Sequence, residues 1–484
     1  MNNKKETKRL LINTALIAFG NLGAKLISFL LLPLYTSILT TSDYGIYDFI
    51  ITISTFLTPV VSLSLYESLF RFLIEAKQKD DNKKVKNVIS CSIILTIICE
   101  IIYFVISIII FWISKINYIP ILTLYVISGI LYLFSISLLR GIGQLKFYAL
   151  YSGIKNALQV LLSYISVAKL NLGINGLLFA TIITSFGISI AIFIHFKLWE
   201  YISIRKENFK MAKDLVKYSL PLVPDSVGTT IVGMADRIVV KGVLGNSENG
   251  IYSIAHKFPS MIEVIYHFFM TAWNESASRV YESSKENQEK IKEYYQELYK
   301  FTQRFIIGAV LGLLAVMPLL FKVLIKGDYI RAFEYIPILL IAQLLNCIAN
   351  FYSGILIANK DTRKIAKSTL IAAGINVILN ISLVFFLGMY GVLIGTLISN
   401  IVLVLIRKNN SDKYIKLDEN YKYLLITICV FVIILLLYDY NNIYKCIVAI
   451  IISIIYFFVT NNMFILMVFQ WIKRKVSKKK EEKV

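Results

Sequence analysis

Charged side chains are scarce in this sequence. Asp, Glu, Lys and Arg make up 17% of its 484 residues, whereas hydrophobic residues make up 57% and the mean hydropathy is +0.69. A water-facing surface needs far more charge than this. The composition therefore excludes a soluble globular protein.

The sequence also lacks the motifs of cofactor and metal chemistry. Its five cysteines stand singly, without a CxxC pair or a histidine at the spacing of a metal site, and we interpret them as inert thiols. There is no GxxxxGK[ST] phosphate-binding loop. We predict no metal, no cofactor and no ATP hydrolysis by this chain alone. The expected outward loops are too short for a catalytic domain, so we predict that the protein is not an enzyme.

Long apolar runs are abundant, and a helix needs about 20 apolar residues to cross a bilayer. We predict an all-α integral membrane protein with about fourteen transmembrane helices. Alternate connections collect most of the 51 Lys and Arg residues, which places both termini in the cytoplasm. The first apolar run lacks a cleavage site, so we expect it to remain as a span. The net charge of +21 then indicates anionic membrane lipid as a partner, and not nucleic acid.

Two short motifs occur twice in the same order. Residues 42–47 read SDYGIY and residues 247–252 read SENGIY, while residues 173–181 (GINGLLFAT) are echoed by residues 388–396 (GMYGVLIGT). Six predicted spans separate the copies, which indicates a parallel repeat of two pseudo-symmetric six-helix lobes. Proteins with two such lobes typically transport by rocking them around a site at their interface.

The predicted organisation follows from this repeat. We expect an N-terminal lobe with helices 1–6 (1–200), a basic cytoplasmic linker (201–217), a second lobe with helices 7–12 (218–408), and two further helices with a basic cytoplasmic tail (409–484).

Several charges fall inside predicted spans, where each costs on the order of 3 kcal/mol unless it has a partner or a polar cavity. The bases are Lys25, Lys155, Arg237 and Lys257, and the acids are Glu67, Glu100, Asp225, Asp236, Glu263 and Glu275. Arg237 and Lys257 flank one outward turn at similar depth and form a basic patch with Lys25, unless Asp236 neutralises Arg237 locally. A basic patch suits phosphate or pyrophosphate, whereas acids suit proton or sodium coupling. Glu100 is isolated, so a structural pair or a lipid-facing neutral acid is an equal alternative to a functional role.

Helix-loosening residues occur in the same spans. Gly20, Gly23, Pro221, Pro224 and Pro259 are hinge candidates, with packing kinks as the alternative.

These segments resemble those of a known protein family. The runs SLPLVPD (219–225), ADR (235–237) and GIYSIAHKFP (250–259), with Ala272-Trp273, resemble the seventh and eighth helices of bacterial polysaccharide repeat-unit flippases. Residues 21–23 (NLG), 33–35 (PLY) and 43–45 (DYG) resemble the first helix and loop of the same family. These flippases belong to the MATE-like multidrug/oligosaccharidyl-lipid/polysaccharide exporter superfamily.

The resemblance implies a function in the bacterial cytoplasmic membrane. It implies flipping of undecaprenyl-pyrophosphate-linked oligosaccharide repeat units from the cytoplasmic to the outer leaflet by alternating access, for O-antigen or capsule biosynthesis. Polysaccharide polymerase and chain-length proteins would be partners, and an H⁺ or Na⁺ gradient or the membrane potential would drive transport. The implied pyrophosphate-binding candidates are Lys25, Lys155, Arg237 and Lys257, and the implied coupling or gating candidates are Asp225, Asp236, Glu263 and Glu100.

Three other functions remain open. A lipid II flippase would have similar chemistry, and a cation-coupled multidrug antiporter would share the fold but favour an acidic, aromatic cavity. A membrane polysaccharide polymerase fits less well, because it needs a catalytic loop at the membrane face.

Overall fold

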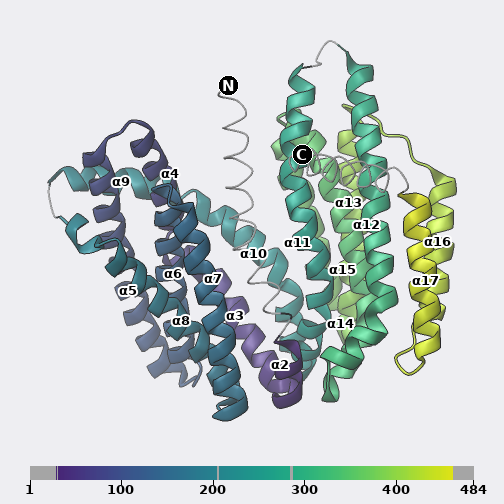
Figure 1. The fold of residues 1–484 in the computed structure, drawn as a ribbon, viewed down its shortest axis with the longest axis horizontal. Helices are drawn as coiled ribbons and strands as arrows, with labels where there is room; N and C mark the ends of the chain where they lie inside the picture. Colours follow the sequence, from purple (N-terminus) through teal and green to yellow (C-terminus); the bar gives the residue numbers. More distant parts are fainter. Residues whose placement is uncertain (1–28, 30, 204–205, 284–286, 462–484) are drawn as a thin grey trace, which may run out of the picture. The chain divides into compact units, whose positions relative to one another are not determined.

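The structure is a computed structural model that describes residues 29, 31–203, 206–283 and 287–461 (Figure 1). Within these residues every regular element is a helix, and nine helical segments are long and apolar enough to cross a membrane. The prediction of an all-α multi-pass membrane protein is confirmed. The total of fourteen spans stays a prediction, because parts of the first and last predicted spans lie outside the described residues.

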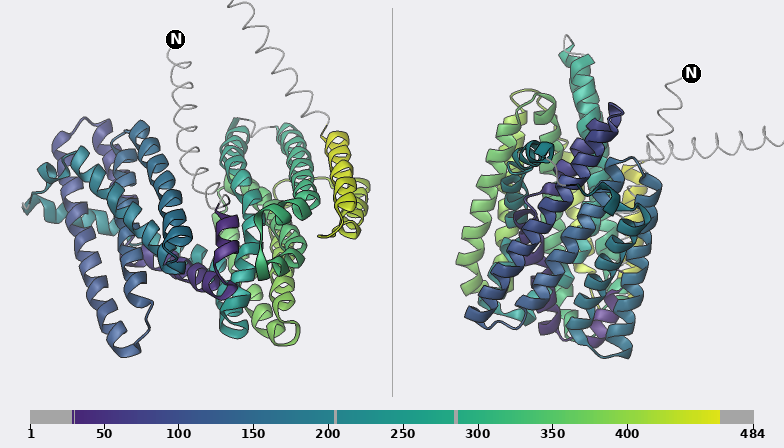
Figure 2. Two further views of the ribbon diagram at one scale, coloured as in Figure 1. Left: turned by 60° about the horizontal axis from the view of Figure 1, so that its bottom comes forward. Right: turned by 90° about the vertical axis from the view of Figure 1, so that its left-hand side faces the viewer.

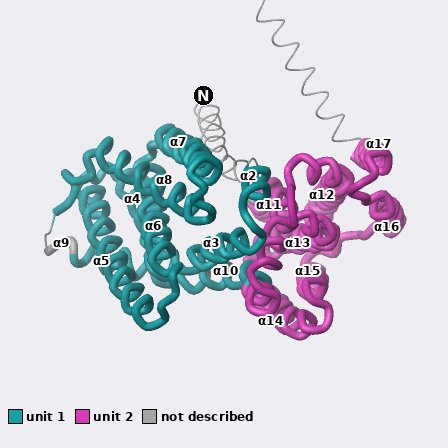
Figure 3. Tube along the Cα trace, turned by 90° about the horizontal axis from the view of Figure 1, so that it is seen from below, with its two compact units in different colours: residues 1–237 teal, residues 238–484 magenta. Residues whose placement is uncertain are grey.

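The chain forms two compact units, residues 1–237 and residues 238–484 (Figure 3). The helices of the first unit are α2 (Leu32–Ile38), α3 (Thr41–Val61), α4 (Leu65–Gln78), α5 (Asn82–Ser114), α6 (Ile119–Gly141), α7 (Leu145–Tyr164) with the π-helical turn η1 (Ile165–Lys169), α8 (Gly173–His195), η2 (Leu198–Tyr201), α9 (Lys206–Ser219) and most of α10 (Leu222–Val239). The described part of the predicted basic linker (201–217) is thus largely helical.

Helix α6 is central to the first unit and packs against α4, α5, α7 and α8. Leu69 and Leu73 of α4 are fully buried against Leu138 of α6. The helices approach so closely that a Cβ atom on Gly141 would lie 2.9 Å from the Leu73 side chain. By contrast, most large apolar side chains in the second half of α5, such as Trp112, are exposed, as expected for a lipid-facing surface.

The connection from α4 to α5 is held by an acid between two bases. The Glu75 carboxylate accepts hydrogen bonds from Lys84 Nζ at 2.9 Å and Lys79 Nζ at 3.1 Å. Mainly through Lys84, these contacts lower the pKa of Glu75 to about 2. Its stabilising contribution is therefore present above the unfolded pKa of about 4.3 and lost only as the pH falls through about 2. Ion pairs on an exposed carboxylate such as Glu75 add little to stability.

The second unit contains the remaining helices. They are η3 (Val240–Leu244), α11 (Asn246–Ser283), α12 (Gln288–Leu324), η4 (Gly327–Tyr335), α13 (Ile336–Ala358), α14 (Thr362–Leu387), α15 (Met389–Ser411), α16 (Tyr421–Leu436) and α17 (Ile443–Thr460). Helix α13 packs against both α11 and α15, and α14 and α15 form a close antiparallel hairpin. The trailing pair α16 and α17 lies at the edge of its unit and packs on α12 (Figure 2).

Helix starts follow their capping residues. The side chains of Thr40, Asp81, Asn287, Asn420 and Asn442 each accept a hydrogen bond from a backbone N–H in the first turn of the helix that follows. These bonds satisfy donors that the helix itself leaves unpaired.

The second repeated motif has the same backbone form in both copies. Gly173 and Gly388 both have φ = +56°, a left-handed value that favours glycine. Three residues later, a Cβ atom on Gly176 or Gly391 would lie 2.8 Å or 2.3 Å from atoms of the preceding segment. Both copies therefore need glycine for the same two reasons, a positive φ and a close approach.

Candidate functional site

Lys155 is a cation held by neutral groups inside the first unit. This half-buried side chain on α7 donates from Nζ to Gln159 Oε1 at 3.1 Å, and Nζ lies 4.8 Å from the centroid of the Tyr132 ring. None of the described residues brings a carboxylate to it. An ammonium held only by an amide oxygen and an aromatic face keeps its capacity to bind an anion.

The repeated motif contributes a threonine to the polar group around Lys155. The second copy of the motif makes the equivalent contact within the second unit. Gln159 Nε2 donates to Thr181 Oγ1 at 3.0 Å, and in the second unit Asn376 Nδ2 donates to Thr396 Oγ1 at 3.1 Å. The same threonine in each copy thus accepts an amide N–H from the helix before it. The repeat carries polar interior contacts as well as backbone form.

Arg237 is already paired. Its Nε donates to Asp48 Oδ2 at 2.8 Å, and the two side chains are only 19% and 16% exposed. The Nη1 atom also donates to the Gly233 carbonyl at 3.2 Å. Asp236 was the neutralising acid expected from the sequence, and Asp48 was not singled out. Asp48 directly follows the first copy of the repeated motif, which was the available signal.

The other predicted bases and acids are placed less fully. Lys25, Gly20 and Gly23 lie outside the described residues, and for Asp225 only the position in the first turn of α10 is described. The remaining predicted residues fall on described helices: half-buried Asp236 on α10, and half-buried Lys257 with exposed Glu263 on α11. The basic patch of Lys25, Arg237 and Lys257 therefore stays a prediction.

The hinge candidates occupy different positions. Pro221 lies in the turn between α9 and α10, Pro224 lies in the first turn of α10, and Pro259 lies inside α11. Only Pro259 interrupts the hydrogen bonding of a helix interior, since a proline in the first turn replaces an N–H that has no partner there.

Glu100 on α5 is buried, with 8% of its surface exposed. Its Oε1 atom has no hydrogen-bond partner among the described residues, and no described base pairs with it. An unpaired buried carboxylate costs free energy. A neutral acid fits this environment, whereas the lipid-facing position expected for it does not, because the side chain is buried.

Arg407 is a buried base that was not among the charges singled out in the sequence. Only 5% of it is exposed, because α15 continues to Ser411 and keeps the guanidinium among the helices. It donates to Asn350 Oδ1 at 2.6 Å, Thr369 Oγ1 at 3.0 Å and Ser368 Oγ at 3.3 Å. Among the described residues no carboxylate pairs with it. Its neighbour Lys408 made the segment look like an ordinary basic helix end.

A line of amides continues from Arg407 through α13, α14 and α15. Asn350 donates to Asn346 at 2.8 Å, and Asn346 donates to Asn400 at 3.3 Å. Asn400 donates to the Thr396 carbonyl at 3.0 Å, and Thr396 Oγ1 receives the amide of the helix before it. Side-chain hydrogen bonds between helices add about 0.6–2 kcal/mol each in membrane proteins. The second unit therefore has a polar, hydrogen-bonded interior.

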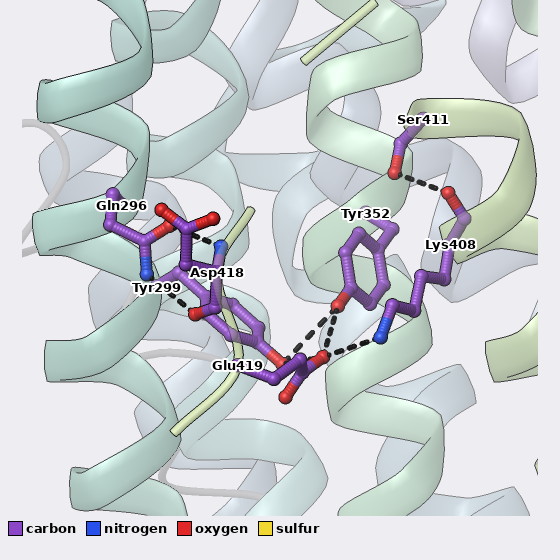
Figure 4. Close-up of polar contacts among 7 residues, drawn as sticks. All are labelled: Gln296, Tyr299, Tyr352, Lys408, Ser411, Asp418 and Glu419. Carbon is purple, nitrogen blue, oxygen red and sulfur yellow. Dashed lines mark hydrogen bonds and ion pairs between the residues drawn. The ribbon is translucent and has the colours of Figure 1, made fainter. Parts of the chain in front are cut away.

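A third cluster fixes the connection between α15 and α16 (Figure 4). Glu419 Oε1 accepts from Lys408 Nζ at 2.8 Å and from the hydroxyls of Tyr299 and Tyr352, each at 3.3 Å. Gln296 binds the backbone of Asp418 through two hydrogen bonds. Its side-chain amide donates to the Asp418 carbonyl at 2.9 Å and accepts from the Asp418 N–H at 2.7 Å. This connection is a fixed part of the second unit.

Replacing Gln296 by leucine should release that connection. The substitution removes both hydrogen bonds to the Asp418 backbone, each worth about 1 kcal/mol. We expect cleavage at residues 412–420 to become roughly 30-fold faster in limited proteolysis of the purified protein, since the two losses sum to about 2 kcal/mol and each 1.4 kcal/mol is about a factor of ten. The control is Gln288→Leu, which changes an exposed residue on the same helix. Equal cleavage rates for both variants would contradict the proposed role of Gln296 in holding the connection.

Comparison with known families and solved structures shows which proteins share this architecture. The profile of the family described as polysaccharide biosynthesis protein matches residues 10–274, more than half of the chain. The chain belongs to the polysaccharide biosynthesis protein family. A MatE profile matches residues 221–382 of this family member as well. The predicted resemblance is thus confirmed, while no curated protein matches the sequence.

Solved structures share the fold of this family member. "Lipid II flippase MurJ, inward closed conformation" has a TM-score of 0.64 and 15% identity, covering 95% of this chain and 100% of that chain. An inward-facing multidrug resistance MATE family transporter of the MOP superfamily has a TM-score of 0.63 and 16% identity, covering 82% and 94%. A MOP superfamily transporter from Pyrococcus furiosus has a TM-score of 0.51 and 16% identity, covering 83% and 93%. At these identities the similarity establishes the fold.

Proposed function

We propose that this family member is a flippase for lipid-linked oligosaccharides. It moves undecaprenyl-pyrophosphate-linked repeat units from the cytoplasmic to the outer leaflet of the bacterial cytoplasmic membrane by alternating access, and supplies O-antigen or capsule assembly. Family membership and a fold shared with a lipid II flippase support this proposal. The observation that carries it is Lys155, a base inside the first unit without a described acid partner.

The surroundings of Lys155 suit a phosphate that arrives and leaves. Its described hydrogen bond is to a neutral amide, Gln159, at 3.1 Å, so an incoming phosphate oxygen replaces a weak acceptor with a charged one. A carboxylate partner would instead compete with the phosphate for the ammonium. The Tyr132 ring holds the cation when the anion is absent.

The membrane potential is sufficient as a driving force in this proposal. A head group with about two negative charges that leaves an inside-negative cell gains roughly 4–5 kcal/mol per 100 mV, at about 2.3 kcal/mol per charge. Coupling to H⁺ or Na⁺ through Asp225, Asp236, Glu263 or Glu100 is the additional part of the proposal.

The experiment uses purified protein in liposomes that contain a fluorescent short-chain polyprenyl-pyrophosphate oligosaccharide. Exposure of the label to an external quencher is followed with and without an imposed potential. We expect potential-sensitive exposure that exceeds the rate in protein-free liposomes. Equal rates with and without protein, together with ion-coupled uptake of an organic cation, would instead favour the antiporter suggested by the MatE match.

Replacing Lys155 by alanine should slow flipping about 10- to 100-fold, because a charge-assisted hydrogen bond contributes about 1.5–3 kcal/mol. Lys155→Arg should retain part of the activity, since it keeps the charge. Lys146→Ala, an exposed lysine on the same helix, is the matched control. Wild-type flipping by Lys155→Ala at equal protein abundance would exclude this residue as the phosphate site. Competition by unlabelled lipid II in the same assay tests the lipid II alternative.

A further inference from the structure

The trailing helices α16 and α17 enclose a groove that the transport proposal does not use. It has a volume of about 560 Å³, within the range of ligand-binding pockets. One end is polar and basic, with Arg304, Asn420, Lys422 and Thr460. Since Tyr421 begins α16 and Thr460 ends α17, this end lies at the helix termini nearest the basic connections.

The two bases at this end have no described acid partner. Arg304 makes one long hydrogen bond, from Nη1 to the Thr460 carbonyl at 3.4 Å, and its guanidinium lies 5.6 Å from the centroid of the Tyr423 ring. Lys422 is exposed, and no described carboxylate pairs with either base. The positive end of the groove is therefore not neutralised by the described part of the chain.

The acids just before α16 are engaged elsewhere. Asp418 pairs with Lys292 at 3.2 Å, and Glu419 pairs with Lys408 at 2.8 Å. Of the three carboxylates in this connection, these two contact other lysines, and the third, Asp412, does not line the groove. Asp418 and Glu419 therefore do not compete with an external anion for Arg304 or Lys422.

Hydroxyl groups connect the two walls of the groove beside its basic end. Tyr456 OH on α17 donates to Tyr423 OH on α16 at 2.8 Å, and Thr427 Oγ1 lies 2.7 Å from Tyr456 OH. Away from this end the lining is aliphatic: Ile426, Val430, Ile452 and Ile455. At 1.5 Å per residue the groove extends roughly 12 Å along the helices, from Lys422 to Val430 on α16 and from Thr460 to Ile452 on α17. The groove combines a basic mouth with an apolar channel.

The surroundings indicate what kind of molecule can enter. Large apolar side chains beside the groove, including Leu425, Ile428 and Ile451, are exposed, as on a surface covered by lipid. We propose that the groove binds one anionic glycerophospholipid, with its phosphate at Arg304 and Lys422 and an acyl chain along the aliphatic walls. A zwitterionic phospholipid fits less well, because the positive group of its head group would lie close to the positive charges of Arg304 and Lys422. This inference does not depend on the transported substrate.

The test is native mass spectrometry of the full-length protein with phosphatidylglycerol or phosphatidylcholine of equal chain length. We expect preferential retention of one phosphatidylglycerol. Each base near an anionic lipid contributes about fivefold in affinity, so R304Q/K422Q should lower phosphatidylglycerol retention roughly 25-fold. K300Q/K416Q removes two exposed lysines that do not line the groove and should keep the wild-type preference.

Further variants keep the test decisive if the double variant does not fold. K422Q alters one exposed side chain and should weaken phosphatidylglycerol about fivefold. Ile455→Trp narrows the channel without changing charge and should reduce retention of both lipids. Equal retention of the two lipids by the wild type would overturn the proposal. Stoichiometric displacement of phosphatidylglycerol by polyprenyl-pyrophosphate oligosaccharide would also overturn it, and would assign the groove to the substrate.

Discussion

Replacing Arg237 by alanine is expected to lower the free energy of unfolding by about 3–5 kcal/mol, because the change leaves the Asp48 carboxylate unpaired. The Asp48 side chain is only 16% exposed, and it forms an ion pair with the Arg237 Nε at 2.8 Å. Water cannot fully replace that contact at such burial. The measurement is the unfolding midpoint of purified protein in detergent, compared with wild type.

A double-variant cycle separates this pair from a role in substrate binding. Arg237→Gln with Asp48→Asn removes both charges, so it should destabilise the protein less than the sum of the single variants by about 1–3 kcal/mol. If the single effects are additive and Arg237→Ala unfolds like wild type, the pair has no structural role. Lost flipping with unchanged stability would assign Arg237 to the substrate instead.

The second large effect is expected at Gly354, where α13 meets α11. A Cβ atom at this position would lie 2.0 Å from Trp273 Nε1, so the indole must move. Trp273 is 1% exposed, stacks on the Phe351 ring at 4.5 Å between centroids, and donates to the Phe351 carbonyl at 3.0 Å. Gly354→Ala sacrifices this stacking and hydrogen bond and should cost about 3 kcal/mol or more.

Gly374 on α14 provides the matched control, because a Cβ atom there meets no other atom within 4 Å. Gly374→Ala should leave stability unchanged or raise it by up to about 1 kcal/mol, since alanine is the better helix former. Fluorescence-detected size-exclusion chromatography after a temperature ramp compares both variants. Similar midpoints for Gly354→Ala and Gly374→Ala would show that the Trp273 side chain relocates without cost.

The sequence predicts some features of this protein better than others, for physical reasons. Hydrophobic length and alternating charge predict a multi-pass helical membrane protein, because the bilayer imposes both patterns on the chain. Helix packing is not encoded in such local patterns, so the pairing of Arg237 with Asp48 across distant helices was missed. Arg407 was not singled out for a related reason. Its charge suggested a helix end, whereas α15 continues past it and neutral side chains hold the guanidinium.

The repeated motif shows where sequence reasoning extends further. Gly173 and Gly388 were matched by letter alone, and they have the same φ. Thr181 and Thr396 close the two copies, and both accept an amide from the preceding helix. The partners of these threonines, Gln159 and Asn376, are not at matching positions of the repeat, so sequence matching could not find them.

The docking of the last helices has a consequence for biosynthesis. Helix α17 packs on α12, and Arg304 of α12 contacts Thr460 and Asn461 at the far end of α17. A ribosome adding about 5–20 residues per second needs on the order of 10–30 s to travel from one contact partner to the other. During that interval the α12 surface must be covered by lipid or by the insertion machinery. A chain that stalls before α17 thus presents the quality-control system with an unfinished surface on an otherwise assembled helix bundle.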